Sequence, residues 1–137
     1  MIVADTGAVL SLIDADDRHH RVMVELFESD PGAWVLPWAI LPEVDYLLMA
    51  HVSARAQRAF MRDLSSGAFQ VEWGDERDLV RARELSEKHA ALKLGLVDAV
   101  VVAVAERLRA SAIATFDLRD FGAVTIAGAP KLLPRDR

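Results

Sequence analysis

Four acidic side chains stand at positions from which they could act together on a metal ion. Asp5 follows the first apolar run of the chain, and Asp117 follows a late one. Asp98 directly precedes the apolar segment 99–105, where an unpaired charge is costly. Glu43 lies in a helical pattern that follows another apolar run. Each acid alone has an ordinary explanation as a helix cap, a turn former or a solvated residue, but the four together favour a shared site.

The chemistry of such a site follows from its charge. Two carboxylates about 5 Å apart repel each other by about 3 kcal/mol at an effective dielectric near 20, so a cluster of four needs cations. The chain has no cysteine, and its four histidines do not pair at the spacing of a His-x-x-x-His metal site. Hard oxygen ligands favour Mg²⁺ or Mn²⁺ over zinc. We expect most of the histidines at the surface: His19, His20, His51 and His89.

The elements that must position these acids alternate along the chain. Strands are expected at 1–5, 33–36, 69–73, 112–115 and 123–127, followed by a mobile tail after residue 130. The helices expected between them include one capped by Thr6, one over 53–64 and an apolar one over 94–108. This order predicts an α/β fold, a single domain over 1–137 with a mainly parallel sheet of four to five strands flanked by helices. Ligands of such sheets bind at the carboxyl ends of the strands.

Composition agrees with one globular domain. Of the 137 residues, 53% are hydrophobic and 27% charged, which suffices for a core. The four acids account for most of the net charge of -5. No stretch reads as a signal peptide, and no apolar run approaches the roughly 20 residues that span a bilayer. We therefore expect a cytoplasmic protein with no membrane partner.

Four segments, taken together, resemble a known family. They are Ile2-Val-Ala-Asp5-Thr6, Leu41-Pro-Glu43-Val-Asp-Tyr-Leu47, Leu94-Gly-Leu-Val-Asp98-Ala99 and Ala114-Thr115-Phe-Asp117-Leu-Arg-Asp120-Phe121. In these segments and their order the sequence resembles the PIN-domain ribonucleases, and among them the VapC toxins of type II toxin–antitoxin pairs. The most specific feature is Gly-Leu-Val-Asp-Ala before an apolar helix, followed later by Thr-x-Asp.

The resemblance implies a Mg²⁺- or Mn²⁺-dependent endoribonuclease in which water activated by the ion cleaves RNA phosphodiesters. It further implies a homodimer that a cognate antitoxin protein holds inactive. By this resemblance, the metal-binding and catalytic acids are Asp5, Glu43, Asp98 and Asp117, and Thr6 and Thr115 supply hydroxyls that orient them.

Two residues near these acids raise further expectations. Pro42 directly precedes Glu43, and an interior proline removes a helix hydrogen bond, so a late helix start or a kink that displaces Glu43 is expected. Asp120 lies close to Asp117 and either binds metal or caps a loop.

RNA contacts would come from basic and aromatic side chains. The arginine candidates are Arg55, Arg58, Arg62 and Arg119, although a solvated face explains them equally well. The aromatic candidates for base stacking, core packing or dimer contacts are Trp34, Trp38, Tyr46 and Phe60, and we expect Trp34 to be a core residue.

Two phosphate-handling functions fit the sequence less well. A haloacid-dehalogenase-type phosphatase starts from Asp-x-Asp, but position 7 is Gly. A receiver-like phosphoacceptor needs a lysine near a late strand end, and Lys131 lies in the tail. A noncatalytic PIN-like module that binds RNA or protein remains the alternative to the nuclease.

Overall fold

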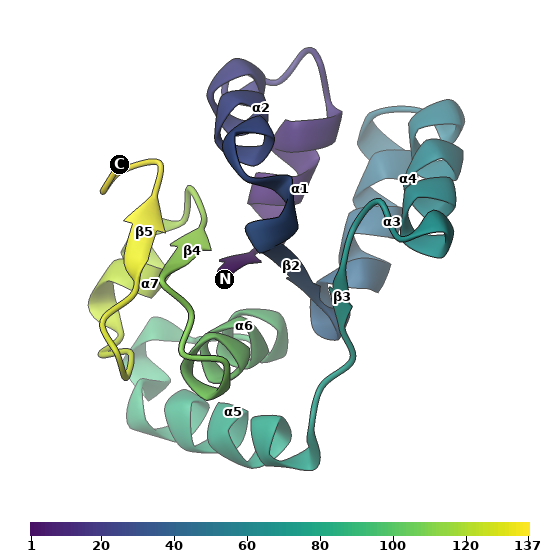
Figure 1. Cartoon of the computed structure of the whole chain (residues 1–137). Helices are drawn as coiled ribbons and strands as arrows, with labels where there is room; N and C mark the ends of the chain where they lie inside the picture. The colour runs from purple at the N-terminus through teal and green to yellow at the C-terminus, as the bar shows by residue number, and fades with distance from the viewer.

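The five strands form one parallel sheet in a computed structural model that describes residues 1–137. The strands are β1 (Ile2–Ala4), β2 (Trp34–Pro37), β3 (Val71–Glu72), β4 (Ala112–Ala114) and β5 (Lys131–Leu133). Their order across the sheet is β3-β2-β1-β4-β5, with β1 at the centre (Figure 1). Val3 of β1 pairs with Val35 on one side and with Ile113 on the other. The predicted α/β fold with a parallel sheet is confirmed.

Helices cover both faces of this sheet. They are α1 (Thr6–Ile13), α2 (His20–Ser29), α3 (Leu41–His51), α4 (Ala54–Ser66), α5 (Glu76–Lys88), α6 (Leu96–Arg107) and α7 (Leu118–Ala123). In Figure 1, α5 and α6 lie below the sheet, α1 and α2 lie above it, and α3 and α4 stand at the β3 side. Short 3₁₀ segments occupy Pro31–Ala33, Trp38–Ile40 and Ala90–Leu92. None of the helices combines the length and the apolar character that crossing a membrane requires.

The strand order creates a switch point between β1 and β4. From β1 the chain continues to β2 and β3 on one side, and it then returns through α5 and α6 to β4 on the other side. Connections leave these two neighbouring strands in opposite directions, which opens a crevice at their carboxyl ends. The sequence places Asp5 directly after β1 and Thr115 directly after β4.

Helix α6 is the centre of the core. Every residue from Ala99 to Ala105 is buried, because α5 covers one side of the helix and the sheet covers the other. A helix that is apolar all round is stable only in such a position. Burial of α6 fixes its amino end, and with it Asp98, beneath the crevice.

The carboxyl-terminal segment differs from the prediction. Residues 123–127, expected as the fifth strand, are not a strand, and α7 ends at Ala123. The fifth strand is Lys131–Leu133, within the tail that was expected to be mobile. The Ala127 N–H donates to Glu106 Oε2 at 2.8 Å. In a strand, this N–H would instead donate to a backbone carbonyl of the neighbouring strand. Leu132 is buried against the core instead.

The start of α3 resolves the question of Pro42. The helix begins at Leu41, so Pro42 lies in its first turn. A backbone N–H at that position has no partner within the helix, and proline is tolerated there. The helix therefore starts just before the proline, and Pro42 requires no kink to place Glu43.

Two further expectations need correction. Asp5, and not Thr6, is the N-cap of α1: its Oδ1 accepts a hydrogen bond from the Ala8 N–H at 2.8 Å. The histidines are less exposed than expected, because three are partly buried and only His51 is exposed.

Candidate metal centre

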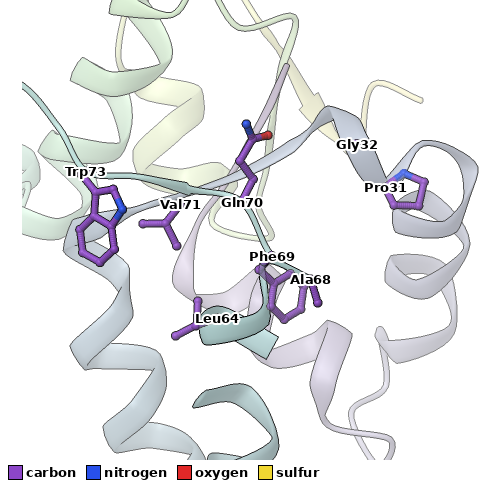
Figure 2. A pocket seen from close by; sticks show the side chains of 9 residues that line it. Pro31, Gly32, Leu64, Ala68, Phe69, Gln70, Val71 and Trp73 are labelled. Atoms are coloured by element: carbon purple, nitrogen blue, oxygen red, sulfur yellow. The ribbon is translucent and has the colours of Figure 1, made fainter. Parts of the chain in front are cut away.

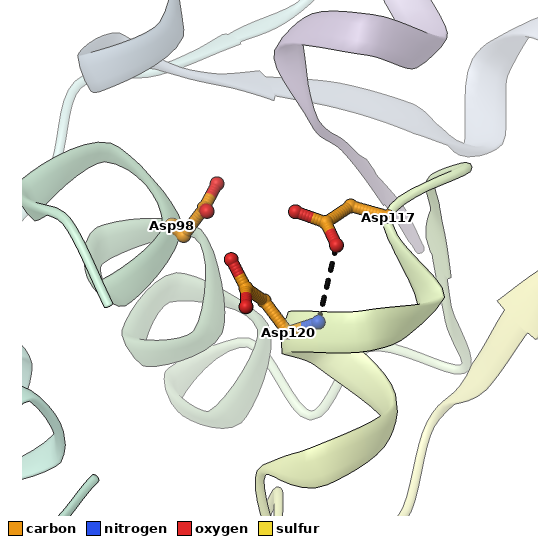
Figure 3. A group of neighbouring side chains, drawn as sticks. All are labelled: Asp98, Asp117 and Asp120. Carbon is orange, nitrogen blue, oxygen red and sulfur yellow. Dashed lines mark hydrogen bonds between the residues drawn. The ribbon is translucent and has the colours of Figure 1, made fainter. Parts of the chain in front are cut away.

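Three carboxylates converge at the switch point of the sheet. Asp98, Asp117 and Asp120 each offer one carboxylate oxygen, and these oxygens lie within 4.8 Å of one another. Figure 3 shows Asp98 on α6 pointing across to Asp117 and Asp120, which belong to the start of α7. Two of the four predicted ligands, Asp98 and Asp117, are thus brought together, and Asp120 joins them.

The first turn of α7 explains how Asp117 and Asp120 are held. Asp117 is the N-cap of this helix, and its Oδ1 accepts a hydrogen bond from the Asp120 N–H at 3.1 Å. Residues three apart lie on one face of a helix, so the two side chains share a direction. Asp98 sits in the first turn of α6, where the helix dipole favours a negative charge.

Both carboxylate oxygens of Asp5 accept hydrogen bonds. Oδ1 caps α1, and Oδ2 accepts a hydrogen bond from the Thr115 hydroxyl. The same Thr115 oxygen accepts a hydrogen bond from the Asp117 N–H at 2.9 Å. Thr115 therefore connects the acid after β1 to the acid after β4, as the predicted orienting role requires.

Burial and repulsion between carboxylates raise the pKa of two of these acids. Burial raises the pKa of Asp5 to about 6, and the charges of Asp117 and Glu43 add to this shift, whereas the hydrogen bond from Thr115 opposes it. Burial also raises the pKa of Asp98 to about 7, with further increases from the nearby negative charges, Asp117 first. Both pKa values are therefore raised mainly because burial removes water from the carboxylates, and the negative charges of the neighbouring acids add to this effect.

Glu43 lies at the rim of this group. It is exposed in the first turn of α3, and its carboxylate is not among the three that come within 4.8 Å of one another. Its charge nevertheless contributes to the raised pKa of both Asp5 and Asp98. Glu43 thus faces the same edge of the sheet without joining the central cluster.

The residues present fit a hard divalent cation. The cluster offers only carboxylate oxygens, which Mg²⁺ and Mn²⁺ prefer. The Thr6 hydroxyl, next to Asp5, is buried without a hydrogen-bond partner in the chain. Buried polar groups are normally paired, so this oxygen is suited to the water shell of an ion or to a substrate. The donor set and the unpaired hydroxyl both agree with the predicted cofactor.

Asp120 is the residue that sequence reasoning left undecided. Its spacing of three from Asp117 was the available signal, but this spacing is informative only on a helix. Residues 118–123 are too few, and too poor in apolar periodicity, to predict one.

The arginines predicted to contact RNA lie in two different parts of the molecule. Arg119 follows Asp117 by two residues and is exposed beside the cluster. The other three arginines are exposed along α4, opposite its buried Gln57 and Phe60. Among the aromatic candidates, Trp34 and Phe60 are core residues, and Tyr46 is exposed.

The largest hollow of the molecule is elsewhere. A groove of about 560 Å³ runs beside β3 and is lined by Leu64, Phe69, Val71, Trp73 and their neighbours (Figure 2). None of its lining side chains is ionisable, so it offers no acid, base or metal ligand.

Comparison with known proteins agrees with this geometry. The sequence model of the PIN domain family matches residues 2–126. The chain belongs to the PIN domain family. Within that family it is of the VapC type, since it is 30% identical to Ribonuclease VapC26 of Mycobacterium tuberculosis over 93% of this chain and 94% of that protein.

Solved structures show the same fold. Mycobacterium tuberculosis VapC20, described as a sarcin-ricin loop cleaving toxin, superimposes with a TM-score of 0.82 at 25% identity and covers 95% of this chain and 99% of its own. A toxin–antitoxin complex from Klebsiella pneumoniae matches with a TM-score of 0.70 at 20% identity, covering 90% and 92% of the two chains. FitAcB from Neisseria gonorrhoeae matches with a TM-score of 0.64 at 14% identity, covering 96% of both chains.

Proposed function

We propose that this chain is a Mg²⁺- or Mn²⁺-dependent endoribonuclease and the toxin of a toxin–antitoxin pair. The observation that carries the proposal is the convergence of three aspartates from α6 and α7 at the switch point between β1 and β4. Membership of the VapC type supports the same activity.

The acids of the site would have two different roles. Asp98, Asp117 and Asp120 would hold the ion, and Asp5 and Glu43 would add negative charge at the same edge. When bound, a divalent ion makes water more acidic and neutralises the charge that develops on a phosphodiester. Thr115 would keep Asp5 and Asp117 in register through its two hydrogen bonds.

The partners proposed are RNA, a cognate antitoxin and a second copy of the chain. VapC20 is described as a toxin that cleaves the sarcin-ricin loop, which makes structured ribosomal RNA a reasonable first substrate to test. Exposed leucines on α5 and α6, Leu79 and Leu96, line one shallow groove and support a homodimer contact. Sedimentation over a range of protein concentrations tests that contact.

The experiment that tests the activity is RNA cleavage. Purified protein is incubated with transfer RNAs and ribosomal RNA fragments, including a sarcin-ricin loop hairpin, in Mg²⁺, Mn²⁺ or chelator. We expect cuts at discrete sites that require the metal. Asp98→Asn should lower the rate on the order of a hundredfold or more, because a ligand of the ion is lost.

The matched control is Asp63→Asn, the same chemical change at an exposed position of α4 without an ion pair. It should cleave at the rate of the unaltered protein. An equal loss of cleavage in both variants would contradict the assigned role of Asp98. Metal binding without cleavage of any RNA would instead favour the noncatalytic PIN-like module.

A further inference from the structure

Two rings from distant parts of the chain stack beside the acidic cluster. The His19 imidazole and the Phe116 ring lie with their centroids 4.0 Å apart and their planes inclined by 16°. His19 directly precedes α2, and Phe116 lies between Thr115 and Asp117. One member of the stack is therefore the immediate neighbour in sequence of a carboxylate in the cluster.

Hydrogen bonds hold His19 in place. Its backbone N–H donates to Asp17 Oδ1 at 2.7 Å, and its ring Nε2 accepts from Arg18 Nε at 3.1 Å. The next residue is also fixed, since His20 Nδ1 lies 2.8 Å from the Ser11 carbonyl oxygen. Both rings of the stack are only partly buried, so part of the ring pair faces solvent. The stack is an ordered aromatic surface that solvent reaches in part.

Free positive charge accompanies this surface. Arg18 and Arg119 are exposed, and neither takes part in an ion pair. In contrast, Arg21, three residues after Arg18, is paired with Glu25 at 3.6 Å. A guanidinium group without a carboxylate partner, next to an aromatic stack, is suited to bind a nucleotide. The rings offer a plane for the base, and the guanidinium offers a charge for the phosphate.

We propose that His19, Phe116 and Arg18 form a nucleotide subsite at the edge of the metal centre. An unpaired base of the RNA stacks on the exposed part of the His19–Phe116 pair, and Arg18 contacts a backbone phosphate. This inference rests on the proposed ribonuclease function. It makes the substrate a strand whose bases are unstacked near the cut, as in a loop, because a base within a duplex cannot reach the rings.

The test is direct binding of a probe. A short single-stranded oligouridine RNA carrying one 2-aminopurine is titrated into the protein in an Asp98→Asn background, where cleavage is expected to be too slow to interfere with the titration. Stacking of 2-aminopurine quenches its fluorescence. We expect quenching on binding, and we expect His19→Ala to weaken binding on the order of tenfold and to reduce the quenching. His19→Tyr retains an aromatic face and should restore both.

The charge of Arg18 is tested separately through salt. Loss of one phosphate contact to a single strand should reduce the slope of log Kd against log salt concentration by about 0.7. We expect this change in Arg18→Ala. Arg21→Ala is the matched control, since its guanidinium is already paired with Glu25, and it should leave the slope unchanged.

Control measurements separate this subsite from a packing role. His20→Ala removes the neighbouring ring and should leave quenching intact. The rise in melting temperature on adding Mg²⁺ to His19→Ala, in the otherwise unaltered protein, should match that of the parent. If His19→Ala instead lowers this rise while probe binding and quenching stay unchanged, the stack only supports the Asp117 turn and the inference is overturned.

The outcome also distinguishes the inference from the proposed function. If the parent protein cleaves RNA with metal but binds the probe equally well with and without His19, the subsite is wrong and the ribonuclease stands. If no RNA is cleaved and the probe is not bound, both are wrong.

Discussion

At the scale of the residue, the acids of the site differ in what they have free to offer. Asp5 uses one oxygen to cap α1 and the other to accept from Thr115. Asp98 accepts no hydrogen bond within the chain, and Asp120 likewise keeps its carboxylate free. The central cluster can therefore bind a cation, whereas Asp5 also fixes the geometry around it. This difference leads to two predictions.

The first prediction concerns pH. Between the unfolded value of 3.8 and the raised pKa of about 6 for Asp5 and about 7 for Asp98, the folded chain binds more protons than the unfolded chain. The free energy of unfolding of the metal-free protein should then fall as pH rises from about 4 to about 7. For buried Asp5 the shift from 3.8 to about 6 corresponds to roughly 3 kcal/mol. The pKa of Asp75 and of Asp136 is lowered to about 2, so these two acids change the free energy of unfolding only below about pH 4.

Thermal unfolding in chelator at pH 5 and pH 8 measures this effect. Mg²⁺ should raise the melting temperature more at pH 8 than at pH 5, because protons compete with the ion for the carboxylates. Asp98→Asn should flatten the pH dependence, and Asp63→Asn should not. A metal-free protein that becomes more stable between pH 5 and pH 8 would contradict the raised pKa values assigned to burial and to the neighbouring charges.

The second prediction concerns Thr115→Val, which keeps the shape of the side chain and removes its hydroxyl. Asp5 loses a hydrogen-bond donor, and the Asp117 N–H loses its acceptor. We expect RNA cleavage to fall by about 10- to 100-fold and stability to fall by about 1–3 kcal/mol. Thr115→Ser keeps the hydroxyl and should retain most of both. Cleavage at the full rate by Thr115→Val would show that the link between the two acids is dispensable.

At the scale of the element, one arginine joins three segments on the side of α6 away from the cluster. Arg107 Nε lies 2.7 Å from Asp78 Oδ1 of α5, and Arg107 Nη2 lies 2.7 Å from Glu72 Oε1 of β3. Asp78 is only 2% exposed. It also accepts from the Asp75 N–H at 3.0 Å and so completes the capping box of α5. The network holds the amino end of α5 against the carboxyl end of α6.

The third prediction follows from this network. Arg107→Met leaves Asp78 buried without its partner and should lower the free energy of unfolding by about 3 kcal/mol. Arg83→Met is the matched control, because it breaks an exposed pair with Glu87 on the same helix and should cost about 0.5 kcal/mol or less. Urea denaturation compares the two variants. Equal costs would show that the network contributes no more than a surface pair.

The predictability of the elements depended on local signals. Ser53 caps α4 through the Ala56 N–H, Gly67 ends that helix in the left-handed region, and Asp75 caps α5, as their residue types indicate. Residues 123–127 have the composition of a strand, but they do not lie along an edge of the sheet. Whether a short apolar run joins a sheet depends on which strand edge it can reach, and local sequence does not carry this information.

At the scale of the whole molecule, the carboxyl-terminal strand supports the site from the edge of the sheet. The Thr115 N–H donates to the Leu133 carbonyl oxygen at 2.9 Å, so β5 holds the residue that in turn binds Asp5. Asp136 strengthens this strand, since its Oδ2 accepts from the Leu132 N–H at 2.8 Å. The end of the chain is thus connected to the candidate metal centre through β4.

The fourth prediction tests this coupling by truncation. A chain that ends at Pro130 loses β5 and the buried Leu132, and it should unfold less cooperatively and bind Mg²⁺ more weakly. Removal of Arg137 alone should change neither property, because its only ion pair, with Glu25, is 3.8 Å long and exposed. Circular dichroism melts with and without Mg²⁺ measure both effects. A truncated chain with an unchanged melt would contradict the role of β5.

Local sequence signals were sufficient to predict the α/β order, the central apolar helix and the acids at strand ends, because capping residues and hydrophobic periodicity act over a few neighbouring positions. Tertiary structure decided which acids meet. Asp5 meets Thr115 only because β4 returns beside β1, and Asp98 approaches Asp117 because α6 packs against α7. Asp120 joins them because a short helix starts at Asp117. The His19–Phe116 stack arises in the same way, from segments that are distant in the chain. Contacts of this kind depend on strand order and packing, which local patterns do not specify.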